Sequence, residues 1–309
     1  MKPKILVICG PTASGKSDLA LRLAHRLDGE IINADSMQVY RCMDIGTAKP
    51  SAAERDQIPH HLIDIADPDQ PFSAADFAGA ADTAIADVTS RGKRAIVTGG
   101  TGLYIRALLK GLVDSPGGAE EYRQSLHAEA RSLGNEVLLE RLRRVDPELA
   151  GRTHPNNLPR IIRALEVHHL TGIPLSRYQQ EHGFSDLRYH SLQIGIHVDR
   201  TTLYSRIDQR VDRMLEQGLQ REAQWLLDAG YDPQAKAIRA IGYKEMIAHL
   251  AGEYSLEEAI RLIKRNTRHY AKRQLTWFKA DKDILWLEYP AEFDTISRHA
   301  IDFFDQRET

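Results

Sequence analysis

The sequence predicts an α/β fold in which a parallel sheet is flanked by helices and interrupted by an all-helical subdomain. Short apolar runs alternate with segments of helical periodicity in both the first and the last third of the chain. That alternation is typical of parallel sheets whose two faces are covered by helices. Between about residues 115 and 188 helical periodicity continues without a convincing strand, which predicts the insertion.

The first part of the chain supplies four predicted strands and two predicted helices. The run KILVICG at residues 4–10 is apolar throughout, as expected of a strand buried on both faces. Strands are also expected at residues 30–35, 61–66 and 94–100. The intervening helices cover residues 17–27 and 73–90, and Ser73 is a suitable N-cap for the second.

The insertion begins at Ser115-Pro116-Gly117-Gly118, so we expect a core domain of residues 1–114 and 189–309 and an inserted domain of residues 115–188. Its two apolar stripes are the leucines and valine at 138, 139, 142, 145 and 149, and the aliphatic positions 161, 162, 165 and 167. After it, a strand is expected at residues 191–198, helices around 201–229 and 256–279, and a last strand at 284–288.

Composition excludes several classes of protein. With only Cys9 and Cys42, the chain cannot build a disulfide framework or a four-cysteine zinc site. No stretch is apolar enough for a membrane span, and the short first run leads straight into a glycine-rich loop and not a signal peptide. We therefore expect a cytoplasmic protein without membrane association. The net charge of −2 means that any nucleic-acid surface must come from local clustering.

The loop after the first strand fits the pattern G-x-x-x-x-G-K-[ST], which predicts a P-loop NTPase-like core. Backbone N–H groups of such a loop converge on phosphate oxygens, and the following helix N-terminus adds partial positive charge. Lys16 supplies a point charge and the Ser17 hydroxyl suits Mg²⁺. The expected diphosphate-binding residues are Gly10, Pro11, Thr12, Ala13, Ser14, Gly15, Lys16 and Ser17. The motif alone suggests ATP binding and does not identify the reaction.

Two other strand ends should face the same cleft, because ligands of parallel sheets bind at the carboxyl ends of strands. Asp35 ends the second strand and could hold Mg²⁺, deprotonate a hydroxyl, accept a proton from an amine, or simply occupy an exposed turn. In the second glycine-rich end, residues 97–104, the glycines clear space for a ligand, and Thr101 can cap the next helix. This strand ends in glycines, not in an aspartate that supports Mg²⁺, which counts against a motor ATPase.

Long segments of the chain resemble the bacterial tRNA dimethylallyltransferases, also called tRNA isopentenyltransferases. They include GPTASGKS, INADSMQVYRCMDIGTAKP, PHHLIDIADPDQPFS and VTGGTGLYIRAL in the first 108 residues. The resemblance continues as far as Lys279 through the segments RIIRALEVHHLTGIPLS, RAIGYKE and KRNTRHYAKRQLTWFK. The resemblance implies transfer of a dimethylallyl group from dimethylallyl diphosphate to N6 of the adenosine immediately 3′ of the tRNA anticodon, assisted by Mg²⁺.

The resemblance also implies roles for single residues. The P-loop would hold the diphosphate of the prenyl donor, with Ser17 at the metal and Arg210 as a further diphosphate contact. Asp35 would be the base at the adenosine amine, and Thr101 would hydrogen-bond the bridging oxygen of the donor. The target adenine would leave its stack and enter the cleft near both residues. We expect the enzyme to work as a monomer.

RNA contacts are expected at several places. Residues 262–279 contain basic but no acidic side chains, and Arg261, Arg265, Arg268 and Lys272 share one helix face, which suits phosphate contacts. A solvated charged face is the alternative. The expected tRNA-binding residues, mostly implied by the resemblance, are Asp35, Ser36, Met37, Gln38, Thr101, Arg123, Pro159, Arg160, Ile161, Ile162, Arg163, Arg239, Gly242, Tyr243, Lys244, Lys272, Arg273, Gln274, Trp277 and Lys279.

Three rival functions share these features. A P-loop kinase for a small metabolite fits the loop equally well but would need an arginine-rich lid, which the sequence does not clearly contain. An adenylate isopentenyltransferase would leave the insertion and the basic helix without a purpose. A non-catalytic RNA-binding protein is disfavoured by the intact Lys16 and Ser17. The paired histidines His60-His61 and His168-His169 match no zinc spacing, so structural or surface roles are expected for them.

Overall fold

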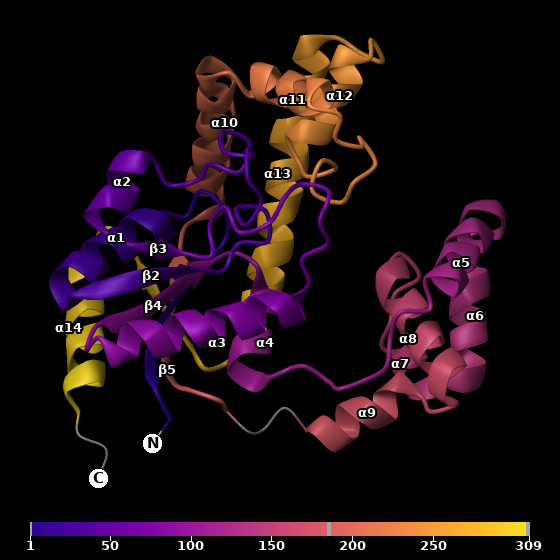
Figure 1. Cartoon of the computed structure of the whole chain (residues 1–309), viewed down its shortest axis with the longest axis horizontal. Coiled ribbons are helices and arrows are strands. Elements are labelled where there is room, and N and C mark those ends of the chain that lie inside the picture. The colour runs from indigo at the N-terminus through magenta and orange to yellow at the C-terminus, as the bar shows by residue number, and fades with distance from the viewer. Residues whose placement is uncertain (1, 184–186, 307–309) are drawn as a thin grey trace. The chain divides into compact units, whose positions relative to one another are not determined.

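The computed structural model of the chain describes residues 2–183 and 187–306 (Figure 1). Backbone contacts divide it into two compact units. The first unit joins Met1–Leu109 to Arg188–Thr309, and the second is Lys110–Leu187. These limits lie a few residues from the domain boundaries expected at 115 and 188.

The first unit is built on a parallel six-stranded sheet in the order β3-β2-β4-β1-β5-β6. Every neighbouring pair is parallel, which confirms the predicted α/β class. Strand β1 pairs with both β4 and β5, so the loop that follows it leaves from the middle of the sheet. The strands are β1 (Lys4–Cys9), β2 (Gly29–Asn33), β3 (His60–His61), β4 (Arg94–Gly99), β5 (His190–His197) and β6 (Ile284–Glu288).

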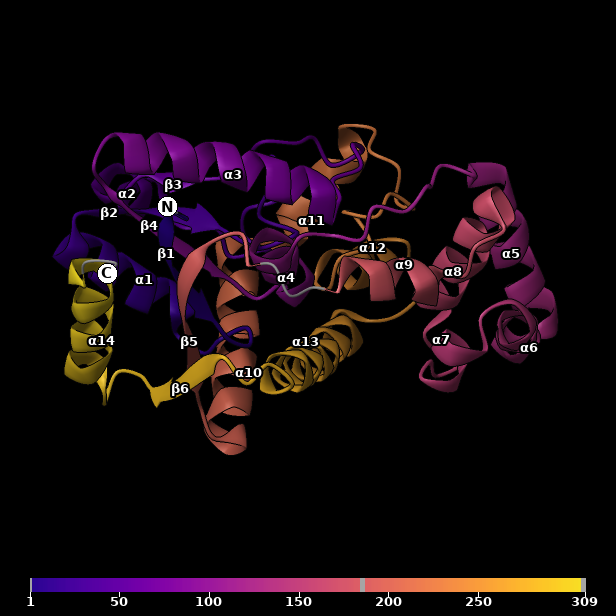
Figure 2. The same ribbon diagram turned by 90° about the horizontal axis from the view of Figure 1, so that it is seen from below.

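Helices cover both faces of this sheet because β1 and its neighbours are apolar on both sides. Ile5, Val7 and Cys9 pack in one buried cluster with α3 (Ala74–Ser90) and α4 (Gly102–Lys110). Leu6 and Ile8 pack in the opposite cluster with α1 (Lys16–Leu27) and α14 (Phe293–Asp305). Figure 2 shows the sheet between these helices. The predicted N-cap is confirmed, since Ser73 Oγ accepts from the N–H groups of Ala75 and Asp76.

Two predicted elements differ in the structure. The strand expected at 61–66 is only His60–His61, because Leu62 and Asp64 adopt left-handed backbone angles, with φ of 64° and 58°, that end it. The long helix expected at 201–229 is two helices, α10 (Arg200–Gln217) and α11 (Leu219–Asp228). Gly218, with φ of 106°, separates them, and a residue with a side chain would be strained there.

A third buried cluster in this unit lies between helices and the loop that follows β2. It joins α11, α12 (Tyr243–Leu250) and α13 (Leu256–Lys279) to Val39, Tyr40 and Met43. The short helix α2 (Ala52–Gln57) comes after this loop and, like α12 and α14, was not anticipated from the sequence. The cluster therefore fixes residues 37–48 against the helices that follow β5.

Within its described residues, the second unit contains helices and connecting loops and no strand. Its core gathers Leu138, Leu139, Leu142 and Leu149 with Ile161 and its neighbours, so the two predicted apolar stripes are confirmed as packing faces. The partly buried Val145 packs against the same core. The helices are α5 (Glu120–Leu133), α6 (Asn135–Val145), α7 (Pro147–Gly151), α8 (Leu158–Thr171) and α9 (Leu175–His182).

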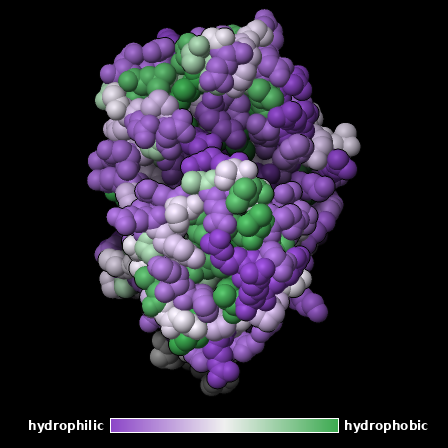
Figure 3. All heavy atoms as spheres, turned by 90° about the vertical axis from the view of Figure 1, so that its right-hand side faces the viewer, coloured by the Kyte–Doolittle hydropathy of each residue, from purple (hydrophilic) through white to green (hydrophobic). Residues whose placement is uncertain are grey.

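The surface is predominantly polar on the face drawn in Figure 3, where hydrophobic side chains lie in small separate groups. Among the described residues, no helix combines the length and the apolar character needed to cross a membrane.

Candidate active site

A cavity of about 340 Å³ opens at the carboxyl edge of the sheet, where β2 and β4 end and the P-loop begins. Thr12, Lys16 and Ser17 line it from the P-loop, and Asn33 and Asp35 line it from the end of β2. Helices α10 and α13 and the loops at 46–48 and 236–242 complete its wall. The predicted meeting of the loop and the second strand end is therefore observed.

The P-loop has the geometry of an anion cradle. Ala13 and Gly15 have positive φ angles of 63° and 98°, which turn successive N–H groups toward one side. Gly15 is the N-cap of α1, so the positive end of the helix dipole points at the same place. The Lys16 ammonium donates to the Pro11 carbonyl at 3.3 Å. Burial lowers the pKa of Lys16 to about 8, partly offset by the nearby Asp35 carboxylate.

Positive charge dominates the cavity wall. Four basic side chains and one carboxylate line it. Burial lowers the pKa of Arg210, the predicted diphosphate contact, although Asp35 raises it. Arg210 Nη2 donates to the Thr47 carbonyl at 3.3 Å. Lys16 and Arg210 are partly buried and Lys236 and Arg239 are exposed, so the wall carries more positive than negative charge and is suited to a ligand with several negative charges. The charged residues are Lys16, Asp35, Arg210, Lys236 and Arg239.

Asp35 is held by its own turn. Its Oδ1 atom accepts from the Met37 N–H at 2.8 Å and from the Gln38 N–H at 3.4 Å. This Asx turn fixes the carboxylate while Oδ2 keeps no hydrogen bond within the part of the chain that the structure describes. A carboxylate oriented in this way can accept a proton from a group that enters the cavity.

Thr101 connects the ends of β2 and β4 but is not among the residues that line the cavity. Its Oγ1 accepts from the Ser36 N–H at 3.0 Å and lies 3.3 Å from Ser36 Oγ. Thr101 O accepts from the N–H groups of Tyr104 and Ile105 at the start of α4. Its place beside Ser36, which does line the cavity, puts the hydroxyl at the rim. Its predicted contact with a donor oxygen stays a prediction.

Apolar side chains form the other part of the wall. Val211 and Met214 come from the inward face of α10, Ile263 comes from α13, and Met37 and Ile241 come from loops. Of these five residues, sequence analysis identified only Met37 as a site residue, as an expected RNA contact, and it did not identify Lys236 or Thr98. The apolar stripes of α10 and α13 were visible in the sequence, but their meeting over the strand ends depends on the tertiary fold. The segment around Lys236 carries no periodic signal at all.

The glycines at the end of β4 make room for the chain itself, and Gly99 also lines the cavity, so the expectation that they clear space for a ligand stays a prediction. A Cβ atom on Gly99 would lie 2.1 Å from the Ala34 carbonyl oxygen. On Gly100 it would lie 2.2 Å from Gln274 Nε2, and on Gly102 it would lie 2.2 Å from the Trp277 ring. A side chain at Gly99 would clash with backbone, and one at Gly100 or Gly102 would displace side chains of α13. Helix α13 therefore packs directly on this strand end.

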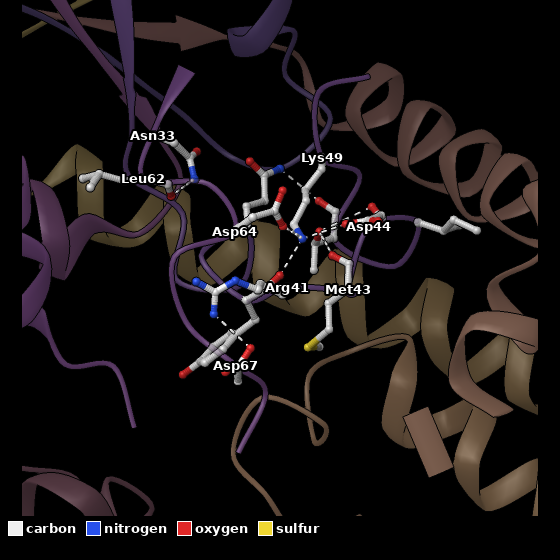
Figure 4. A network of polar contacts seen from close by, with 12 residues as sticks. Asn33, Arg41, Met43, Asp44, Lys49, Leu62, Asp64 and Asp67 are labelled. Atoms are coloured by element: carbon white, nitrogen blue, oxygen red, sulfur yellow. Dashed lines mark hydrogen bonds and ion pairs between the residues drawn. The ribbon is translucent and has the colours of Figure 1, made fainter. Parts of the chain in front are cut away.

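A network of polar contacts fixes the loop that follows Asp35 (Figure 4). The Lys49 side chain is only 2% exposed, and its ammonium binds Asp44 Oδ1 at 2.7 Å, Asp64 Oδ1 at 2.5 Å and the Tyr40 carbonyl. Arg55 binds the other oxygen of Asp64 at 2.7 Å. Separating a buried ammonium from its carboxylate partners is costly, because it leaves an uncompensated charge in the interior. These contacts therefore tie residues 40–49 to the segment after β3.

Glu222 of α11 holds the same loop from the other side. Its carboxylate accepts from the N–H groups of Asp44, Ile45 and Gly46 at 3.0, 2.8 and 3.0 Å. It also accepts from the Tyr243 hydroxyl at 2.6 Å. Gly46 lines the cavity, and a Cβ there would lie 2.5 Å from the Tyr243 ring. The wall opposite the P-loop is therefore rigidly held.

The basic residues of α13 differ in their partners. The expected lack of acidic partners is wrong for two residues of the stripe, because Arg261 pairs with Glu258 and Arg268 with Asp208. It is also wrong for Lys264, which lies outside the stripe and pairs with Asp212. Two of those carboxylates come from α10, which no inspection of α13 alone would reveal. The exposed residues with no carboxylate partner among the described residues are Arg265, Lys272, Arg273 and Lys279.

Several other predicted tRNA contacts have buried side chains. Tyr243, Ile161 and Ile162 are 0–2% exposed, so any contact they make with RNA must come from the backbone. Arg163 binds Glu166 at 2.7 Å and both oxygens of Ser115. These contacts hold the loop that precedes α5 against α8. Ser36, Met37, Gln38, Arg239 and Gly242 line the cavity, whereas Arg123, Pro159 and Lys244 are exposed and Arg160 is partly exposed. All of them stay predictions.

The histidine pairs form no metal site among the described residues, where no cluster of three or more His, Cys, Asp or Glu side chains is suited to an ion. His61 Nε2 lies 2.7 Å from Glu30 Oε2, and His60 Nδ1 lies 2.7 Å from the Ile58 carbonyl. His169 stacks on Tyr122.

Comparison with known proteins establishes the family. The family model described as IPP transferase matches residues 38–281 of the chain. The chain belongs to the IPP transferase family. It is 67% identical to tRNA dimethylallyltransferase 1 of Pelobacter propionicus over 303 residues, 98% of both chains. It is 56% identical to the tRNA dimethylallyltransferase of Geobacter sulfurreducens over 303 residues, which are 98% of this chain and 97% of that relative.

Solved structures of IPP transferases share the fold. The tRNA isopentenylpyrophosphate transferase of Bacillus halodurans superposes with a TM-score of 0.72 at 42% identity, covering 98% of this chain and 97% of that chain. A eukaryotic dimethylallyltransferase acting on tRNA gives a TM-score of 0.80 at 32% identity, covering 99% of this chain and 80% of that chain. The resemblance stated from sequence motifs is therefore confirmed.

Proposed function

We propose that the protein is a tRNA dimethylallyltransferase that moves the dimethylallyl group of dimethylallyl diphosphate to N6 of the adenosine immediately 3′ of the anticodon. One structural observation supports this proposal in addition to the family membership. A single cavity joins an anion cradle with several cations, one oriented carboxylate and an apolar wall. These are the requirements of a diphosphate, an amine nucleophile and a prenyl chain respectively. Because the acceptor is tRNA, the enzyme would act in the cytoplasm.

The reaction would proceed as a displacement at C1 of the donor. The N6 amine forms a bond to C1 while the bond from C1 to the bridging oxygen breaks, and diphosphate leaves. Asp35 accepts the proton that the amine loses. Lys16, Arg210 and the P-loop N–H groups stabilise the charge that develops on the leaving diphosphate, where preorganised donors act most strongly. Thr101 would donate to the bridging oxygen from the rim of the cavity.

Magnesium fits the oxygen-rich part of this site. The Ser17 hydroxyl lines the cavity beside the place where the diphosphate oxygens would lie, and hard oxygen ligands are what Mg²⁺ prefers. Thr98 Oγ1 is buried, lines the same cavity and has no hydrogen-bond partner among the described residues, which leaves it free for a ligand or a bound water. When bound, Mg²⁺ would neutralise part of the diphosphate charge. Ser17 is the residue we expect to hold it.

The RNA would dock on α13 and its surroundings. Lys272, Arg273 and Lys279 are exposed and form no ion pair within the described part of the chain, which leaves their charges available for phosphate contacts. Trp277 is 42% exposed among them and offers a surface on which a base can stack. Because Asp35 lines the wall of a cavity and is only partly exposed, the target adenine must leave its stack to reach it.

Incubation with radiolabelled dimethylallyl diphosphate and either unmodified tRNA or AMP, with ATP as the control phosphate donor, separates the candidate functions. We expect label in tRNA alone. Label in AMP would identify an adenylate isopentenyltransferase. Consumption of ATP with no use of the prenyl donor would identify a kinase, and binding of tRNA without any transfer would leave only an RNA-binding protein.

Substitutions in the cavity test the assigned roles in the same assay. Under single turnover with saturating substrates, we expect Asp35→Asn to slow transfer by about 10²–10⁴-fold, the usual contribution of a positioned base. We expect Lys16→Ala to slow transfer by about 10²–10³-fold, as for loss of one preorganised donor, and Thr101→Ala to slow it similarly. A wild-type rate for Asp35→Asn would remove this carboxylate from the mechanism.

A further inference from the structure

Gln274 of α13 is buried between the P-loop and the glycine-rich end of β4. Its side chain is 6% exposed. Its Oε1 atom accepts from the Thr12 N–H at 2.9 Å, and its Nε2 atom donates to the Gly100 carbonyl at 2.8 Å. One carboxamide therefore bridges the loop that carries Lys16, which lines the cavity, and the loop that carries Thr101, which lies at its rim.

Neighbouring contacts show that this bridge is closely fitted. A Cβ atom on Gly100 would lie 2.2 Å from Gln274 Nε2, so only glycine lets the carboxamide reach the carbonyl. One turn earlier on the helix, Tyr270 lines the cavity, and its pKa is raised by burial and by the nearby Asp35. One turn later, Trp277 packs on Gly102. Three consecutive turns of α13 thus touch the parts of the site that must be aligned.

The chemistry of the carboxamide suits a buried bridge of this kind. It provides one donor and one acceptor, which are what a backbone carbonyl and a backbone N–H require. It adds no charge next to Lys16 or to an incoming diphosphate. A glutamate would place a second acceptor against the Gly100 carbonyl, and a lysine would leave the Thr12 N–H without an acceptor.

We propose that Gln274 is a positioning residue that sets the distance between the diphosphate cradle and the Thr101–Asp35 side of the site. It acts through Thr12 and Gly100 and does not touch the reacting atoms. This role rests on the proposed function and deepens it, because transfer needs the leaving diphosphate and the nucleophile in line. It also differs from the RNA contact expected for Gln274, since both polar ends of the side chain are already occupied.

The test compares Gln274→Met, which keeps the shape of the side chain and loses both hydrogen bonds, with the wild-type protein. Thr276→Ala is the matched control, because Thr276 is an exposed residue on the same helix. We expect Gln274→Met to slow single-turnover transfer by about 10²-fold, as a misplacement of about 1 Å can do. Its tRNA affinity should stay that of the wild type. Thr276→Ala should behave as the wild type in both assays.

Hydrogen exchange supplies a readout that does not depend on activity. Peptides covering the P-loop and residues 97–103 should exchange faster in Gln274→Met, while peptides from β5 should not change. A wild-type single-turnover rate in Gln274→Met would overturn the proposal. So would a loss of tRNA affinity with a normal rate at saturating tRNA, since that result would make Gln274 an RNA contact.

The outcome for the proposed function stays separate. If the wild-type protein transfers no dimethylallyl group to tRNA, the proposed function fails, and hydrogen exchange still decides whether Gln274 holds the two loops together. If Gln274→Met is unstable, Gln274→Glu gives a second comparison, because it keeps the acceptor for Thr12 and opposes the Gly100 carbonyl. We expect it to be slow in transfer as well, and a wild-type rate would contradict the role of the Gly100 contact.

Discussion

At the scale of single residues, Glu30 shows how a buried charge is made tolerable. It lies on β2, three residues before Asn33, and is only 4% exposed. Its carboxylate binds both terminal nitrogens of Arg91 and, at 2.7 Å, His61 Nε2. The hydrogen bonds from Arg91 and His61 outweigh the opposing effect of burial and lower the pKa of Glu30 to about 2. The ion pair joins β2, β3 and the end of α3.

This lowered pKa predicts a specific dependence of stability on pH. Because the folded-state pKa lies below the ordinary value of 4.5, the stabilisation is complete above about pH 4.5 and is lost as the pH falls toward 2. We expect Glu30→Gln to lower the free energy of unfolding by about 1–3 kcal/mol at pH 7, a range that allows for the solvent exposure of Arg91.

Urea unfolding of the wild type and the variant at a series of pH values measures the effect. The difference between the two proteins should shrink steadily below pH 4.5. A difference that is the same at pH 7 and pH 3 would show that the stabilisation is not electrostatic.

At the scale of elements, the loop from Asp35 to Lys49 owes its shape to contacts from distant helices. Glu222 of α11 binds three consecutive N–H groups at residues 44–46, and the Lys49 network ties the far end to Asp64. Gln38 closes the loop on itself by donating to the carbonyls of Thr47 and Ala48 at 3.1 Å. Residues 46–48 can therefore form a fixed wall of the cavity although they belong to no helix or strand.

Removal of Glu222 should loosen this wall and leave the sheet intact. We expect Glu222→Ala to lower the free energy of unfolding by on the order of 2 kcal/mol, because hydrogen bonds to a charged group are lost. Hydrogen exchange should accelerate in peptides covering residues 42–49 and stay unchanged in β4, and prenyl transfer should slow. Gln224→Ala, an exposed position on the same helix, is the matched control. Unchanged exchange at residues 42–49 would contradict this account.

How far each element could be predicted follows from the same physics. The core strands and the P-loop were predictable because apolar runs and the G-x-x-x-x-G-K-[ST] pattern act locally. The end of β3 depends on left-handed angles at Leu62 and Asp64, which no periodicity announces. Asp35 and Lys16 could be placed together from strand ends alone. Lys236 and Met214 could not, and Gln274 was expected only as an RNA contact, because their places in the site depend on the tertiary fold.

At the scale of the whole molecule, the formal net charge of −2 hides an uneven distribution. Ion pairs neutralise part of α13, and three of its four exposed cations without a carboxylate partner among the described residues, Lys272, Arg273 and Lys279, lie in its C-terminal half. Affinity for a polyanion therefore depends on a few residues and not on a generally basic surface.

Salt dependence measures that local contribution. For the wild-type protein, the logarithm of tRNA affinity should fall linearly with the logarithm of salt concentration. We expect the variants Lys272→Ala and Arg273→Ala each to weaken binding and to reduce the slope by about 0.7–0.9, the value for one lost phosphate contact. Arg298→Ala, an exposed position on α14, removes the same charge elsewhere and should leave the slope unchanged. Equal effects of all three would mean that only overall charge matters.

The carboxylate of Glu222 also affects where a negatively charged substrate can bind. The three N–H groups at residues 44–46 converge as the P-loop amides do, and left open they would attract phosphate oxygens. The Glu222 carboxylate occupies this second group of N–H donors instead. We therefore expect the charged head of a donor to bind at the P-loop and not at residues 44–46.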